Sequence, residues 1–141
     1  MSLSLDERQQ FLAEPLIAAL AVEAGSDRGP LNVPIWYQYK PGEKPWILTS
    51  VGSRKARLIA QAGYFSLMVQ RLEPTVRYVT VEGAVSHTAP GTKEMLWEMS
   101  SRYLPEDKVA DYVAFASAEH GEQIAVYLEP ERWLSADLGA G

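Results

Sequence analysis

The sequence reads Thr49-Ser50-Val51-Gly52-Ser53-Arg54-Lys55-Ala56-Arg57 across the junction between a predicted strand (45–50) and a predicted helix (53–62). This stretch holds three hydroxyl and three cationic side chains in nine residues. Free N–H groups at a helix N-terminus attract anions, arginine binds phosphate through two hydrogen bonds, and lysine adds a point charge. The stretch therefore fits a phosphate cradle. The alternative is a solvated helix start with Ser53 as its N-cap, and the G-x-x-x-x-G-K-[ST] spacing of a P-loop is missing.

On both sides of this junction, short apolar runs alternate with turn residues. Early antiparallel hairpins and a late helical pair favour an α+β fold with a small barrel. Residues 129–137 are expected to form a short extended tail. The pattern predicts about six strands (16–23, 31–39, 45–50, 64–71, 77–88 and 123–128) and three or four helices, with candidates from Ser4 to about Glu14 and over 53–62, 91–104 and 105–121.

Two of the predicted strands contain residues with a specific structural meaning. Pro34 has no N–H to donate, so the strand 31–39 should lie at a sheet edge or face a ligand. Gly83 suggests a β-bulge in the strand 77–88. The aromatic side chains at Trp36 and Tyr37 could flank a planar ring, or they could be core or dimer contacts.

Composition and charge narrow the function classes. The chain has 141 residues, which predicts one domain over 1–141, and its net charge of −5 argues against a protein built to bind nucleic acid. It has no cysteine and two histidines, so no metal site is expected. The start, with Asp6 and Glu7 and no long apolar stretch after them, is not expected to be a signal peptide. The most apolar run, Pro15–Val22, is much shorter than the ~20 residues of a membrane span. We expect a cytoplasmic protein that does not contact membranes.

Other groups that could carry chemistry have simpler explanations. His87 and His120 are interpreted as surface histidines, at a strand end and a helix C-terminus. The methionines Met95 and Met99 have helical spacing and are interpreted as core residues. No catalytic residue is assigned.

Three motifs in this order resemble the pyridoxamine 5′-phosphate oxidase-like family of FMN-binding split barrels. The resemblance runs from about Phe11 to Ser86. The motifs are Asn32-Val33-Pro34-Ile35-Trp36-Tyr37, then Leu48-Thr49 with Gly52-Ser53-Arg54-Lys55-Ala56, then Arg77-x-Val79-x-Val81-x-Gly83; the tail Leu128-x-Pro130-x-Arg132-Trp133 is also similar to the end of many small members.

The resemblance implies an antiparallel split β-barrel with flanking helices. It also implies a homodimer with one FMN per subunit at the dimer interface, and an oxidoreductase that passes a hydride or electrons to a small-molecule substrate. The cofactor-binding residues that it implies, together with the hydroxyl and cationic side chains of the junction, are Asn32, Val33, Pro34, Ile35, Trp36, Leu48, Thr49, Ser50, Ser53, Arg54, Lys55, Arg57 and Tyr78.

The chain departs from the oxidases of this family at three positions. Leu31 and Trp36 stand where the oxidases have basic residues, and Tyr78 stands where they have glutamine. Their C-terminal substrate-binding Arg/His segment has no match. Pyridoxine phosphate chemistry is therefore not expected. A deazaflavin-dependent reductase and a non-enzymatic flavin- or haem-binding module are the alternatives.

Overall fold

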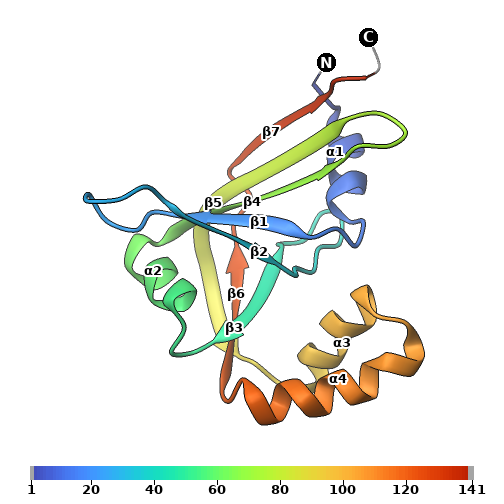
Figure 1. Ribbon diagram of the computed structural model, residues 1–141. Helices are drawn as coiled ribbons and strands as arrows, with labels where there is room; N and C mark the ends of the chain where they lie inside the picture. Colours follow the sequence, from blue (N-terminus) through green and yellow to red (C-terminus); the bar gives the residue numbers. More distant parts are fainter. Residues whose placement is uncertain (1, 140–141) are drawn as a thin grey trace.

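The computed structural model describes residues 2–139, and its α+β architecture agrees with the prediction (Figure 1). Within these residues there are seven strands rather than about six. The elements are α1 (Leu5–Leu12), β1 (Ala18–Val22), β2 (Leu31–Ile35), β3 (Trp46–Ser50), α2 (Arg54–Ala62), β4 (Tyr64–Arg71), β5 (Arg77–Pro90), α3 (Lys93–Tyr103), α4 (Glu106–Glu119), β6 (Gln123–Leu128) and β7 (Arg132–Asp137).

A curled antiparallel sheet forms the body of the protein. Its strand order is β2-β1-β4-β5-β6-β3, and β7 pairs with β5 off this path. The 14-residue strand β5 joins the two halves, because its first part pairs with β4 and β7 and its second part pairs with β6. The α3–α4 pair lies at the end of the barrel where β6 begins (Figure 1).

The core fills the inside of this sheet. Alternate residues of β1, β4 and β5 are buried, as in Leu20, Leu67 and Val81, which have no exposed surface. Phe11 of α1 and Ile59 of α2 pack against the same cluster. Period-two burial of this kind is what a strand with one covered face requires.

Three of the four helices within residues 2–139 begin at a side-chain cap, whereas α4 begins after Pro105 without one. The Ser4 and Glu7 side chains form a capping box, and the Ser53 and Thr92 side chains accept hydrogen bonds at the starts of α2 and α3. Gly63, at a φ of 69°, ends α2 in the left-handed region that favours glycine. Within residues 2–139, every helix falls short of the length and apolar character that a membrane crossing requires.

The strand predicted over 31–39 ends at Ile35, which corrects the sequence prediction. After this point the Tyr37 N–H donates to the Tyr103 hydroxyl (3.1 Å), so a helix side chain replaces a neighbouring strand. Gln38 keeps only an isolated bridge to Trp46. The prediction for Pro34 is confirmed, because β2 is an edge strand of the sheet.

The expected tail over 129–137 is also wrong, because it contains β7. This strand pairs with β5 from Arg77–Asp137 to Glu82–Arg132. Asp137 fixes its end: burial alone would raise the pKa of this carboxyl, but hydrogen bonds from Thr75 and Arg77 outweigh burial and lower it. The segment forms a strand because it pairs with an edge of β5 that no other strand occupies, and because the Asp137 contacts fix its end.

Two smaller predictions also need correction. The first helix ends at Leu12 rather than near Glu14. The irregularity of β5 lies between Val85 and His87 and not at Gly83. Gly83 instead pairs with Phe65 and lies against the carbonyl oxygen of Glu129, so close that a Cβ would overlap it. The glycine thus marks a close backbone approach.

Candidate functional site

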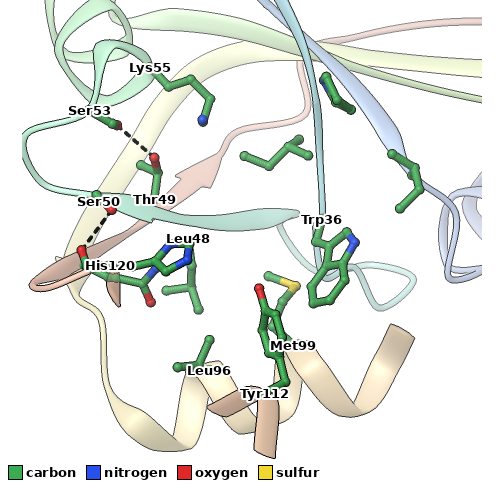
Figure 2. A pocket seen from close by; sticks show the side chains of 14 residues that line it. Trp36, Leu48, Thr49, Ser50, Ser53, Lys55, Leu96, Met99, Tyr112 and His120 are labelled. Atoms are coloured by element: carbon green, nitrogen blue, oxygen red, sulfur yellow. Dashed lines mark hydrogen bonds between the residues drawn. The ribbon is translucent and has the colours of Figure 1, made fainter. Parts of the chain in front are cut away.

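A cavity of about 480 Å³ lies between the end of β2, the β3–α2 junction and the α3–α4 pair (Figure 2). Its volume is in the range of ordinary small-molecule sites. One side is polar and the other is apolar and aromatic. It is lined by Ile17, Pro34, Ile35, Trp36, Leu48, Thr49, Ser50, Ser53, Lys55, Leu96, Met99, Tyr112, His120 and Gln123.

The polar side is the start of α2. The Ser53 hydroxyl accepts from the Ala56 N–H (3.1 Å) and lies 2.9 Å from the Thr49 hydroxyl. Within residues 2–139 the N–H groups of Arg54 and Lys55 have no hydrogen-bond partner, as expected for the first turn of a helix. The Lys55 side chain extends into the cavity (Figure 2), and none of the described residues forms an ion pair with it.

The aromatic side is built around Trp36. Its ring stacks on Tyr103 at 4.7 Å between centroids and 13° between planes. The Tyr112 ring lies 5.3 Å away at a tilt of 41°. Leu48 of β3 packs against the small core that α3 and α4 share. These contacts give the cavity a flat apolar wall opposite Lys55.

Polar contacts, of which the Tyr37–Leu12 hydrogen bond is buried, tie the segment that carries Trp36 to the end of α1 and to α3. Arg102 of α3 donates to the carbonyl oxygens of Ala13 (2.8 Å) and Glu14 (2.7 Å), and its guanidinium lies 4.8 Å from the centroid of the Tyr37 ring. Burial raises the pKa of the Tyr37 hydroxyl, which donates to Leu12 at 2.6 Å and stays neutral at physiological pH. These contacts hold Trp36, and with it the aromatic wall of the cavity, in place before any ligand binds.

A hydrogen bond connects the two sides of the cavity. The Ser50 hydroxyl at the end of β3 donates to the carbonyl oxygen of His120, the residue after α4 (3.0 Å). This contact holds the end of α4 beside the β3–α2 junction (Figure 2). It brings together residues that are 70 positions apart in the chain.

The cavity gathers much of the residue set predicted from the sequence. The predicted residues that line it come from the end of β2 and from the junction: Pro34, Ile35, Trp36, Leu48, Thr49, Ser50, Ser53 and Lys55.

The other five predicted residues do not line the cavity. Asn32 and Val33 line a neighbouring hollow of about 250 Å³, which shares Ile17 and Pro34 with the main cavity. The predicted residues on other surfaces are Arg54 and Arg57, exposed on α2, and Tyr78, which pairs with Gln70 and Ala136 in the sheet.

Six lining residues were not predicted as site residues. Met99 was interpreted as a core residue and His120 as a surface histidine; Met99 is indeed buried and His120 exposed, yet both reach the cavity. Nothing local in the sequence marks these positions, because only the docking of the α3–α4 pair brings them here. The unpredicted residues are Ile17, Leu96, Met99, Tyr112, His120 and Gln123.

Comparison with known proteins identifies the fold. A solved structure named F420 reductase matches with a TM-score of 0.70 and 20% identity over 89% of this chain and 94% of that one. The FAD and heme binding protein from Mycobacterium smegmatis matches with a TM-score of 0.66 and 20% identity, over 98% of this chain and 72% of that one. A candidate pyridoxamine 5′-phosphate oxidase from Listeria innocua matches with a TM-score of 0.60 and 10% identity, over 93% of this chain and 96% of that one. The fold is thus the predicted antiparallel split barrel with flanking helices.

Comparison at the level of sequence gives no match. No family model matches the chain, and no curated protein resembles it. The identities to the solved structures are low, so the likeness establishes the fold alone. The function has to be argued from the cavity.

Proposed function

We propose that this protein binds a flavin-type cofactor, FMN in the first instance, and acts as an oxidoreductase on a small molecule. One observation carries the proposal: a single cavity joins an anion-attracting helix start, with the Lys55 side chain free of partners among residues 2–139, to a flat apolar wall at Trp36 and Leu48. A flavin cofactor has the same two ends, a phosphate and a planar ring. The split-barrel fold, which the chain shares with flavin-related proteins, supports the proposal.

The residues present suit the two ends of such a cofactor. The phosphate would bind to Lys55, the Ser53 hydroxyl and the N–H groups at the start of α2, where the helix dipole also favours an anion. The ring would lie along Leu48 and the segment from Pro34 to Trp36, which would orient it and keep water from one face. The bound flavin would supply the hydride or electron chemistry, and the protein would supply binding and orientation.

A deazaflavin-dependent reductase is the second candidate. The structure named F420 reductase has a TM-score of 0.70 to this chain, above the 0.60 of the oxidase-like structure from Listeria innocua. A phosphate-bearing deazaflavin presents the same two ends to the cavity. A flavin- or haem-binding module without turnover is the third candidate, because another structure with this fold is named an FAD and heme binding protein.

We also propose that the protein is a homodimer with the cofactor at the interface. The outward face of the sheet carries a row of paired residues, all uncharged: Pro34, Ala19, Met68, Thr80 and Leu134. Leu134 is 51% exposed and Ile17, directly before β1, is 53% exposed, so the face offers apolar side chains that a second copy could cover.

This face reaches the rim of the cavity. Ile17 and Pro34 belong to both the cavity and the neighbouring hollow, so a second copy on this face would close the cavity from that side. Sedimentation is expected to give a dimer at micromolar concentration, and a monomer there would contradict this part of the proposal.

Absorption and titration test the cofactor. The purified protein is expected to carry flavin absorption bands, or to quench the fluorescence of added FMN after the cofactor is removed. Tight binding of the deazaflavin coenzyme without binding of FMN would establish the second candidate. A Soret band, with neither flavin bound, would overturn the flavin proposal. A bound and reduced flavin that passes electrons to no tested acceptor would favour the non-enzymatic module.

A further inference from the structure

Three aromatic rings of the α4 region form a continuous strip next to the cavity. The Phe115 ring lies 6.4 Å from the Tyr112 ring and 6.2 Å from the His120 ring, measured between centroids. Tyr112 also contacts Trp36 at 5.3 Å. The strip therefore extends the aromatic wall of the cavity from Trp36 to the end of α4.

Packing of the helix pair does not explain the strip. The small core between α3 and α4 consists of Leu96, Val109, Val113 and Ala116, with Tyr112 packed against its side. Phe115 is not in that core and is 57% exposed. Phe115 lies between two residues that line the cavity but is not a lining residue itself, so its exposed ring extends the apolar surface outward from the rim of the cavity.

The polar groups of the strip face the cavity. Figure 2 shows the Tyr112 hydroxyl pointing into the cavity, and within residues 2–139 it has no hydrogen-bond partner. The His120 ring also projects into the cavity, beside Leu48. Apart from His120, the one titratable cation on the described wall is Lys55, at the opposite end. The aromatic end can therefore donate a hydrogen bond, and none of the residues that line the cavity there is a lysine, an arginine or a carboxylate.

We propose that the strip formed by Tyr112, Phe115 and His120 is the substrate subsite, which takes a flat, uncharged aromatic compound that carries a hydrogen-bond acceptor. The compound would lie against the Phe115 ring and accept from the Tyr112 hydroxyl. This inference rests on the proposed function, because it gives Lys55 and the wall at Leu48 and Trp36 to the cofactor, and the strip beyond that wall to the substrate. The Tyr112 ring, 5.3 Å from the Trp36 ring, marks where the cofactor's wall ends and the strip begins.

The test uses 2-acetylnaphthalene and its saturated analogue 2-acetyldecalin, with binding measured by calorimetry on the full chain freed of cofactor. The wild type is expected to bind the flat ketone more tightly than the saturated one. Phe115→Ala is expected to weaken binding of the flat ketone by about 2–12-fold, which is what one aromatic pair contributes. Tyr112→Phe, which keeps the ring and removes the donor, is expected to cost about as much.

Trp97→Ala is the matched control. Trp97 of α3 is an aromatic residue of comparable exposure, 47%, and is not part of the strip formed by Tyr112, Phe115 and His120. Equal binding of the two ketones, or a Phe115→Ala effect no larger than that of Trp97→Ala, would overturn the proposal. A parallel loss of FMN affinity in Phe115→Ala would assign this ring to the cofactor and would also overturn it. If FMN fails to bind the wild type, the proposed function fails, but the ketone assay still tests the subsite.

Discussion

Replacement of Lys55 by alanine separates a phosphate site from an ordinary helix start. Lys55 lines the cavity, and its ammonium group has no ion-pair partner among residues 2–139. The variant therefore removes no contact that supports the fold, and alanine is a better helix former than lysine. The stability should change by no more than about 0.5 kcal/mol.

The effect on cofactor binding should be much larger. The Ser53 hydroxyl and the N–H groups of Arg54 and Lys55 remain in the variant, so only the charge-assisted contact to phosphate is lost. Such a contact contributes about 1.5–3 kcal/mol, which corresponds to a loss of ~10–150-fold in affinity.

The assay is a paired titration. FMN and the deazaflavin coenzyme are titrated into the wild type, Lys55→Ala and Lys108→Ala, and the urea midpoint of each apo-protein is measured. Lys108 is an exposed lysine of α4 outside the cavity, so its replacement makes the same change of charge at a distance. Unchanged affinity for both cofactors in Lys55→Ala, at an unchanged midpoint, would refute the phosphate-site argument. A loss for one cofactor alone would identify the one that the site holds.

Three further predictions concern the structure around the site. Gly83→Ala should lower the free energy of unfolding by about 1–3 kcal/mol in urea, since the new Cβ would overlap the Glu129 carbonyl oxygen; an unchanged midpoint would contradict this close approach. The pKa of Asp137 is lowered in the folded protein, so this carboxylate stabilises the fold at a pH above its ordinary pKa of 3.8, and that stability is lost as the pH falls through the folded pKa. Asp137→Asn should therefore reduce the loss of stability on acidification. Identical acid-unfolding curves of the two proteins would refute the assignment. Arg102→Leu should cost about 1.5–3 kcal/mol, because carbonyl groups after α1 lose their charged donor; a smaller cost by thermal or urea unfolding would show that Arg102 does not hold this segment.

The β3–α2 junction was predictable because its signals are local. Ser53 caps the helix and Gly63 ends it, and the hydroxyl residues before Ser53 and the cationic residues after it are close neighbours in the chain. Eight predicted residues line one cavity because two short segments, the end of β2 and the junction, carry all of them. Arg57, by contrast, is in the same helix but exposed, since a position on a helix surface depends on which face is covered.

The α4 wall and strand β7 could not be predicted in this way. Tyr112 and His120 reach the cavity through the docking of α4, supported by the Ser50–His120 hydrogen bond across 70 positions. Trp133 lies in a segment where apolar and polar residues alternate only weakly. It belongs to a strand because this segment pairs with the free edge of β5 and because the Trp133 ring lies 6.4 Å from the Tyr39 ring. Tertiary contacts decide both features, and no local pattern encodes them.

A crystal structure with the preferred cofactor bound tests the central claim most directly. The account predicts that the phosphate lies within hydrogen-bond distance of Lys55 Nζ, the Ser53 hydroxyl and the first N–H groups of α2, with the ring along Leu48 and Trp36. A phosphate bound away from the start of α2, for example in the separate hollow beside Lys40 and Lys44, would contradict the account.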